Sequence, residues 1–309
     1  MIGITQVTAP SHARERPGRL RRREALYGYL FILPNTLGLI VFFILPVLAA
    51  FALGFVNWDL VQSPTWAGLS NYIALVHDPL FWNGVWTTIY YTIVSVPVSI
   101  AFSLLLAVAV NSGLRERNLY RVAYFMPYVS MPVALALVWK WIYDPQFGLL
   151  DNALGALRLP QPPWLNDPAW AMPSLIIMAI WGSLGYNMIV FLAGLQGISA
   201  ELYEAASIDG AGTLARFWNI TAPLISPATF FVLIISMINS FQVFDQVYIM
   251  TQGGPGNATR VLGLLIYDNA FQYFKMGYAT AFAWALFALI LVVTLIQVIG
   301  QKRWVHYES

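Results

Sequence analysis

Long apolar segments alternate with short polar ones along the whole chain, and six of the apolar segments carry no charge over most of their length. A helix that crosses a bilayer needs roughly 20 apolar residues, and each segment is close to or above that length. Because backbone polar groups find no water in hydrocarbon, we predict helices here; the weak alternation of a barrel strand is absent. The approximate predicted spans are residues 27–56, 84–111, 120–142, 170–195, 222–248 and 277–300.

The composition places the chain in a membrane. Hydrophobic residues make up 59% of it, charged residues only 10%, and its mean hydropathy is +0.66. These values are incompatible with a typical soluble domain. We therefore predict an all-α membrane protein whose transmembrane domain of six helices covers residues 25–301. The Arg-rich segment before the first span is interpreted as a topology signal on a retained helix, because the apolar run after it is too long for a signal peptide.

Basic residues gather at alternate ends of the predicted spans. Lys and Arg are retained on the cytoplasmic side of short loops, so both termini are predicted to lie inside (N-in/C-in). Residues 1–24 then form a basic cytoplasmic tail, and residues 302–309 form a second cytoplasmic tail. The basic residues behind this prediction are Arg14, Arg16, Arg19, Arg21, Arg22, Arg23, Arg115, Arg117, Arg121, Lys302 and Arg303.

The residue types needed for catalysis or metal binding are missing or scattered. The chain has no cysteine, and His12, His77 and His306 lie far apart in a tail, a loop and the other tail. There is no Gly-x-x-x-x-Gly-Lys-Ser/Thr loop to hold nucleotide phosphates. We therefore predict no catalytic residue, no metal site and no cofactor in this chain, and we expect it not to be an enzyme.

A polar island at residues 199–220 separates the fourth and fifth spans, on the side that the basic residues assign to the cytoplasm. Ser199 can cap a short helix whose first turns hold Glu201 and Glu204 near the positive end of the helix dipole. Gly210 is predicted to end that helix, where a left-handed residue would turn the chain.

A second short helix is predicted after this glycine turn. Thr213 is expected to cap it, and the helix would continue through Trp218. Pro223 suits the first turn of the fifth span, because a proline there removes no helical hydrogen bond. The predicted result is a helix-turn-helix elbow that lies along the cytoplasmic face.

The spacing of residues in this elbow resembles the EAA loop of ABC importer permeases. Gly210 lies six residues after Glu204. Ile220 follows ten residues after Gly210, and Pro223 three residues later. Ala222 departs from the family pattern, which usually has leucine before the proline. The residues that carry the resemblance are Glu204, Ala205, Ala206, Asp209, Gly210, Ile220 and Pro223.

Further motifs extend the resemblance across nearly the whole chain. They narrow it to the carbohydrate uptake branch, which includes the maltose-permease F-type and glycerol-phosphate-permease A-type proteins. The matching motifs are Gly68-Leu69-x-Asn71-Tyr72, Phe125-Met126-Pro127, Trp139-Lys140-Trp141, Gly148-Leu149-Leu150-Asp151-Asn152 and Phe244-Asp245-x-x-Tyr248-x-x-Thr251-x-Gly253-Gly254-Pro255.

This resemblance implies the type I ABC importer permease fold, with the elbow as a coupling helix contacted by an ATPase. The chain would form half of a translocation pore with a second homologous permease subunit, as a heterodimer. The other implied partners are two ABC ATPase subunits that bind ATP and Mg, an extracytoplasmic substrate-binding protein and membrane lipid, with no nucleic acid. The implied location is the bacterial cytoplasmic (inner) membrane, which the chain would cross several times.

Polar residues within the fifth span are candidates for the substrate pathway, because polar groups in lipid face a cavity or a neighbouring helix. Ser236, Asn239 and Ser240 fall on one helix face. Val243 and Gln246 continue that face. Gln242 and Asp245 are expected to point elsewhere on the helix.

The fourth span holds a second set of candidates, in which aromatic rings lie beside an amide and a hydroxyl group. These are Trp181, Ser183, Tyr186 and Asn187, with Ser183, Tyr186 and Asn187 assigned to the substrate pathway. Such groups suit the faces and hydroxyls of sugars, although packing against other helices is an open alternative for each residue.

The substrate is predicted to be a sugar or an oligosaccharide. A neutral solute rich in hydroxyl groups fits the uncharged face, whereas a phosphate ester is expected to recruit Arg or Lys. Glycerol-3-phosphate or another small polar solute is the alternative within the same class. An ion-gradient-driven secondary transporter would need buried ionisable pairs, and a membrane enzyme would need clustered acids or histidines; neither pattern is present.

Overall fold

The computed structural model describes residues 18–111 and 117–306. The predicted basic residues Arg14, Arg16 and Arg115 and the last three residues of the second tail lie outside this range. The chain divides into two compact units, Met1–Ala52 and Leu53–Ser309, and each is described by itself.

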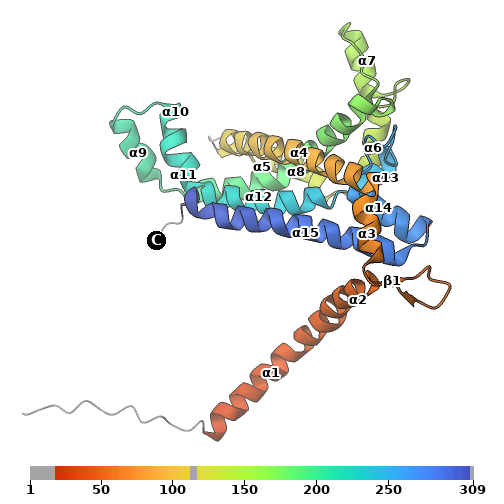
Figure 1. The fold of residues 1–309 in the computed structure, drawn as a ribbon. Coiled ribbons are helices and arrows are strands. Elements are labelled where there is room, and N and C mark those ends of the chain that lie inside the picture. Colours follow the sequence, from red (N-terminus) through yellow and green to blue (C-terminus); the bar gives the residue numbers. More distant parts are fainter. Residues whose placement is uncertain (1–17, 112–116, 307–309) are drawn as a thin grey trace, which may run out of the picture. The chain divides into compact units, whose positions relative to one another are not determined.

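The described residues of the first unit form one long helical run, drawn in red in Figure 1. It consists of α1 (Arg19–Leu39), a π-helical segment (Ile40–Ile44) and α2 (Leu45–Leu53). The run from Arg21 to Leu53 is long and apolar enough to cross a membrane, as expected for the first predicted span.

The second unit contains three more helices of that kind and two bent helix pairs. The helices are α4 (Pro79–Asn111), α8 (Pro168–Gly197) and α15 (Met276–Gly300), the last extended by a 3-10 turn at Gln301–Arg303. The bent pairs are α5 (Arg117–Val129) with α6 (Pro132–Ile142), and residues 213–224 with α12 (Ser226–Phe241). The described part of the chain thus has four candidate spans, or up to six if each bent pair is one span.

The helices of the second unit pack side by side around α4 and α8 (Figure 1). α8 contacts both α4 and α5, and α12 contacts α4, α8 and α15. The remaining elements are β1 (Val56–Asn57), β2 (Thr65–Trp66), α3 (Ser70–His77), α7 (Leu149–Ala156), a 3-10 turn (Trp164–Asn166), α13 (Asp245–Met250), α14 (Leu262–Tyr267) and a π-helical turn (Asp268–Gln272).

Two predicted spans differ from the continuous helices that we expected. In the predicted span 120–142, α5 and α6 meet at an angle of 100°. Met131 there is extended, with φ −60° and ψ 125°, because a residue that precedes proline is disfavoured in the helical region. In the predicted span 222–248, α12 ends at Phe241, and α13 begins only at Asp245.

The Gly-Leu-x-Asn motif holds the chain beside α3. The Asn71 side chain is buried and donates hydrogen bonds to the carbonyl oxygens of Gly54 at 3.1 Å and Val56 at 3.2 Å. Val56 pairs with Trp66 in the short antiparallel ribbon of β1 and β2. The amide thus replaces backbone partners that this irregular segment lacks.

Hydrogen bonds of hydroxyl groups and one ion pair stabilise the segment after α13. The Thr259 hydroxyl lies 2.7 Å from that of Thr251 and donates to the carbonyl oxygen of Gly254 at 2.7 Å. Arg260 forms an ion pair with the buried carboxylate of Asp268 at 3.3 Å. Burial raises the pKa of Asp268 above its ordinary value, and the guanidinium opposes that shift.

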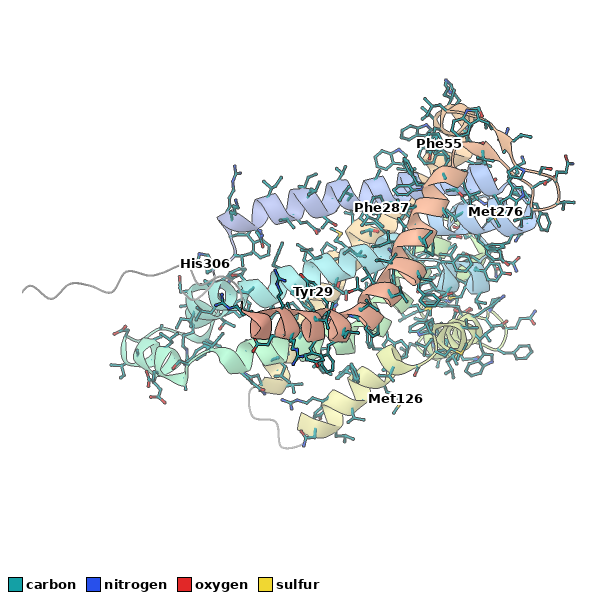
Figure 2. All side chains as sticks on the ribbon, turned by 90° about the horizontal axis from the view of Figure 1, so that it is seen from below. Tyr29, Phe55, Met126, Met276, Phe287 and His306 are labelled. Carbon is teal, nitrogen blue, oxygen red and sulfur yellow. The ribbon has the colours of Figure 1, made fainter. Side chains whose placement is uncertain are left out.

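Large apolar side chains cover the outer surfaces of the second unit, and Figure 2 shows them projecting from its helices. Met126 on α5 is 63% exposed and Phe287 on α15 is 53% exposed. An apolar surface of this extent is unfavourable in water and suits a lipid environment. The helical fold with several apolar helices therefore agrees with the predicted all-α membrane class.

Candidate functional site

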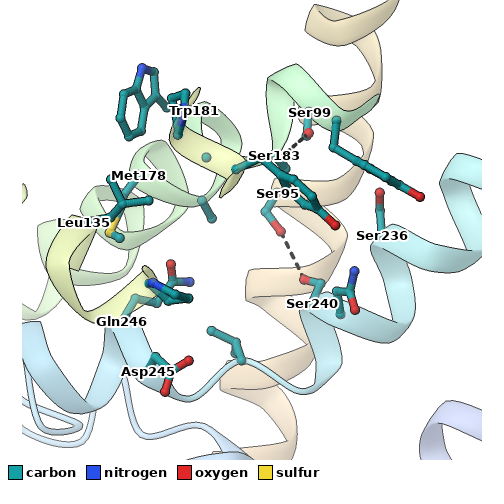
Figure 3. Close-up of a pocket in the computed structure, with 18 of the residues that line it drawn as sticks. Ser95, Ser99, Leu135, Met178, Trp181, Ser183, Ser236, Ser240, Asp245 and Gln246 are labelled. Atoms are coloured by element: carbon teal, nitrogen blue, oxygen red, sulfur yellow. Dashed lines mark hydrogen bonds between the residues drawn. The ribbon is translucent and has the colours of Figure 1, made fainter. Parts of the chain in front are cut away.

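A cavity of about 360 Å³ lies among α4, α5, α6, α8, α12 and α13. Figure 3 shows side chains of these helices converging on it. All seven residues predicted for the substrate pathway line this cavity: Ser183, Tyr186, Asn187, Ser236, Asn239, Ser240 and Val243. The structure therefore brings together two sets of residues that the sequence offered on separate spans.

Residues of α4 complete the cavity, and we did not predict them. The hydroxyls of Ser95 and Ser240 are 3.2 Å apart, and Ser240 donates to Thr92 at 3.1 Å. The hydroxyls of Ser99 and Ser183 are 2.7 Å apart. Dashed lines in Figure 3 mark this contact and the one between Ser95 and Ser240. A sequence signal for this wall exists: small hydroxyl residues recur every three or four positions, at Thr88, Thr92, Ser95, Ser99 and Ser103.

Several of these polar groups join neighbouring helices. The buried Asn187 amide of α8 donates to the Ser99 hydroxyl of α4 at 3.2 Å. Ser240 joins α12 to the same helix through Ser95 and Thr92. We call these contacts the interhelical network. It fixes the spacing of three helices on one side of the cavity.

Ser240→Ala is expected to destabilise the chain, whereas Ser236→Ala on the same helix is not. Ser240 bonds two hydroxyls of α4, while the Ser236 side chain makes no hydrogen bond within the described residues. Interhelical hydrogen bonds in membranes contribute about 0.6 kcal/mol each, so we expect a cost of about 1 kcal/mol. Thermal unfolding of the two variants in detergent measures the difference, and equal melting temperatures would contradict it.

Tyrosine rings from three helices line the cavity. The Tyr128 and Tyr186 rings stack with centroids 4.7 Å apart and planes 19° apart. Elsewhere the Gln246 amide donates to the Tyr91 hydroxyl, which joins α13 to α4. A tyrosine ring offers a flat apolar face, and its hydroxyl is a polar group at the edge of that face.

Gln242 and Asp245 both line the cavity, which corrects the expectation that they point elsewhere on the helix. That expectation assumed one helical period through residue 248. Because α12 ends at Phe241 and α13 starts at Asp245, the intervening turn changes the direction of the side chains. Asp245 and Gln246 appear at this edge of the cavity in Figure 3.

The polar island begins with α9 (Ala200–Ile208), whose ends are as predicted. The Ser199 hydroxyl accepts a hydrogen bond from the Glu201 backbone N–H at 3.3 Å. Gly210 has a φ of +77°, and the next N–H, that of Ala211, donates to the carbonyl oxygen of Ala206 at 2.8 Å. This arrangement satisfies the last carbonyl groups of the helix, as expected for a left-handed cap.

The second arm of the elbow differs from the prediction. It consists of α10 (Thr213–Arg216), a π-helical segment (Phe217–Thr221) and α11 (Ala222–Leu224). Thr213 is the first helical residue; the N-cap is Gly212, without a side-chain hydrogen bond. Pro223 lies in the first turn of α11, before the 64° bend that precedes α12, and not in the first turn of α12 itself.

Side-chain contacts hold the two arms together. Arg216 donates to the Ser207 hydroxyl at 2.9 Å, and the hydroxyls of Tyr203 and Thr221 are 2.9 Å apart. Glu204, Ala205, Asp209 and Gly210 are exposed, whereas Ala206, Ile220 and Pro223 are partly buried. Large apolar side chains are also exposed here: Ile208 at 87%, Leu214 at 72% and Trp218 at 64%.

Comparisons with known proteins add a family match and close relatives. Residues 66–306 match the family described as binding-protein-dependent transport system inner membrane component. The arabinooligosaccharides transport system permease protein AraP of Bacillus subtilis is 36% identical, over 87% of this chain and 86% of the relative. The lactose transport system permease protein LacF of Rhizobium radiobacter is 34% identical, over 90% and 95%.

A solved structure has the same fold. A chain of a bacterial ABC transporter involved in the import of the acidic polysaccharide alginate superposes with a TM-score of 0.80. It is 24% identical, and the match covers 93% of this chain and 99% of that one. A related crystal structure shows the alginate transporter in complex with a pentasaccharide-bound periplasmic protein.

Proposed function

The chain belongs to the family of binding-protein-dependent transport system inner membrane components, and from this membership we propose that it is a permease subunit of an ATP-driven importer for a neutral sugar or oligosaccharide. Relatives named for arabinooligosaccharides and lactose support the carbohydrate class. The trehalose/maltose transport system permease protein MalF of Thermococcus litoralis, 34% identical, supports it further. As a transport permease the chain is not a catalytic enzyme.

The cavity is the observation that carries this proposal. Its volume falls within the range of about 300–1,000 Å³ that small-molecule sites occupy. Serine hydroxyls, carboxamides and aromatic rings line it, and no Lys or Arg is among the described residues that do. Hydroxyl-rich solutes need such donors, acceptors and flat faces, whereas a phosphate ester such as glycerol-3-phosphate would call for a cation.

We propose that the elbow at residues 199–220 couples this cavity to an ATPase. Ala205 is exposed and Ala206 is partly buried, next to the exposed Glu204. Because alanine side chains are small, this part of α9 is narrow enough to enter a groove of a partner. The elbow also exposes the apolar side chains of Ile208 and Leu214. The full assembly would hold a second homologous permease, two ATPase subunits that bind ATP and Mg, and an extracytoplasmic binding protein, in the bacterial inner membrane with both termini inside.

Uptake by the reconstituted importer tests the function. Proteoliposomes that contain this chain, its partner permease, the ATPases and the binding protein are expected to accumulate a radiolabelled neutral sugar from a panel of arabinose, lactose and maltose oligosaccharides. Accumulation is expected only when ATP fills the vesicles, and vesicles filled with ADP serve as the control. Uptake of labelled glycerol-3-phosphate or an amino acid, with none of the sugars, would refute the carbohydrate class.

A further inference from the structure

The bend between the elbow and α12 lies where the helical hydrogen bonds lose a donor. In a continuous helix the carbonyl of Pro223 would accept from the backbone N–H of residue 227, but Pro227 has none. The Ser226 hydroxyl donates to this carbonyl at 2.6 Å in its place. The helical segments on the two sides of the bend differ in direction by 64°. The angle of the elbow therefore depends on one hydroxyl group and on the groups that orient it.

Residues 301–306, which we call the C-terminal segment, contact that hydroxyl. After α15 the chain turns at Gln301–Arg303, and the backbone N–H of His306 donates to the Ser226 hydroxyl at 2.9 Å. The Trp304 ring meets the Phe230 ring edge-on, with centroids 6.0 Å apart. Figure 1 shows the end of α15 beside α11 and the start of α12. The C-terminal segment thus packs on the first turns of α12.

The two hydrogen bonds of Ser226 support each other. A serine hydroxyl rotates freely and has one proton to donate. Because it accepts from the N–H of His306, its proton is directed to the carbonyl of Pro223, and hydrogen bonds in such a chain polarise one another. Ser226 is only 3% exposed, so water does not compete for these positions.

The same junction is joined to α9. Thr221, five residues before Ser226, is buried, and its hydroxyl lies 2.9 Å from that of Tyr203 on α9. Ile225 between them is 2% exposed. Residues 221–226 therefore bring α9, the start of α12 and the C-terminal segment into contact through buried groups.

We propose that the C-terminal segment fixes the angle between the elbow and α12, and that Ser226 and Trp304 are its positioning residues. A surface helix that is displaced by a partner passes the displacement on only if its base does not yield. The base of this elbow lacks a helical hydrogen bond, and the C-terminal segment compensates for the loss. The inference rests on the proposed coupling role of the elbow, but the angle itself can be measured without any partner.

The distance between two spin labels reports that angle in the full chain, purified in detergent. The chain has no cysteine, so Ile208→Cys on α9 and Phe231→Cys on α12 accept one nitroxide each. These side chains are 87% and 49% exposed. Double electron–electron resonance gives the distribution of distances between the labels, and a less firmly held elbow broadens it.

His306→Pro and His306→Ala are the first matched pair, because proline removes the N–H donor and alanine keeps it. For His306→Pro we expect the share of distances outside the main peak to rise about fivefold. This factor corresponds to about 1 kcal/mol, the net contribution of one hydrogen bond. His306→Ala is expected to show the parental distribution.

Ser226→Ala and Thr229→Ala are the second pair. Both hydroxyls donate to a carbonyl of the preceding turn, but among the described residues only that of Ser226 also accepts from the C-terminal segment. We expect broadening for Ser226→Ala and none for Thr229→Ala. Trp304→Ala is expected to broaden the distribution, whereas Trp304→Phe retains a ring against Phe230 and the parental width.

The assembled importer supplies the functional measurement. Ser226→Ala is expected to raise the number of ATP molecules hydrolysed per sugar transported by a similar factor, while co-purification of the ATPase stays at the parental level. Parental distance distributions for both Ser226→Ala and His306→Pro would overturn the proposal, as would a parental ratio of ATP to sugar in spite of a broadened distribution. A broadened distribution in a chain that associates with no ATPase would refute the proposed function alone.

Discussion

Gly185→Ala is expected to reduce the amount of folded protein severely. Gly182→Ala, about one turn earlier on α8, is expected to leave that amount unchanged. A Cβ atom at Gly185 would overlap the Tyr124 carbonyl oxygen and lie 2.7 Å from the Phe125 Cα atom. A Cβ atom at Gly182 has no such neighbour within 4 Å. Both glycines lie in the interior of the same helix, so the comparison isolates the effect of the atoms that surround each one.

The size of the effect follows from the atoms that are contacted. Overpacking against side chains costs about 1–3 kcal/mol, because side chains can shift. Here the obstacle is the backbone of α5, so the two helices must separate, and we expect a cost at or above that range. Alanine is otherwise favoured over glycine within a helix by about 1 kcal/mol, so Gly182→Ala should be neutral or slightly stabilising.

Fluorescence-detected size exclusion and thermal unfolding in detergent measure both variants. The expected result is a large loss of monodisperse protein for Gly185→Ala, with a parental elution profile for Gly182→Ala. A Gly185→Ala variant that melts within a degree of the parent would show that α8 does not approach α5 this closely.

Gly210→Val is expected to lower ATPase association and sugar uptake at least about tenfold, which corresponds to about 1.4 kcal/mol. Gly210 has a φ of +77°, and an L-residue in this conformation costs roughly 1–2 kcal/mol, most of all when it is β-branched. A Cβ atom there meets nothing within 4 Å. The substitution therefore acts through backbone strain that redirects the elbow and not through a clash.

Gly212→Ala is the matched control, because Gly212 has a φ of −67° and equal space around it. The measurements are co-purification of the ATPase with the permease and uptake by proteoliposomes. The Gly212→Ala variant is expected to match the parent in both. Normal association and uptake by Gly210→Val would mean that the elbow has no coupling role.

The apolar pattern predicted the helical membrane class because segment length and missing charge determine it. It did not predict the bend between α5 and α6. A proline inside an apolar segment is compatible with a continuous helix, such as α4 with Pro97 inside it, or with a complete break, such as the one before Pro132. Contacts with neighbouring helices decide between the two, and the local sequence does not contain them.

The residues predicted from one helical period line the cavity, including Val243 and Gln246 beyond the end of α12, but two other residues that the period excluded also line it. Ser236, Asn239 and Ser240 lie on one face of α12 and reach the cavity together. The assignment of Gln242 and Asp245 was wrong because the period does not continue past Phe241. The α4 wall was missed although its hydroxyl residues have helical spacing, since no charge or aromatic group marks them.

In the elbow, too, one feature was predicted from the sequence and another was not. The position of Gly210 was predictable, because one residue type tolerates a positive φ at low cost. The start of the second arm was displaced by one residue: Gly212 precedes the helix, and Thr213 opens it. Cap positions depend on backbone geometry within a single residue, which a preference for hydroxyl side chains does not determine.

The wall of the cavity contains a short non-helical segment between α12 and α13. Residues 242–244 interrupt the helical hydrogen-bond ladder, and Phe244 has a φ of −145° and a ψ of −60°. α13 packs on α6 and is joined to α4 by the hydrogen bond between Gln246 and Tyr91, whereas α12 packs on α4 and α8. A few non-helical residues can absorb a rotation that a continuous helix would resist. The wall of the cavity is therefore built from two helical segments with different neighbours, joined by a turn whose residues are not helical.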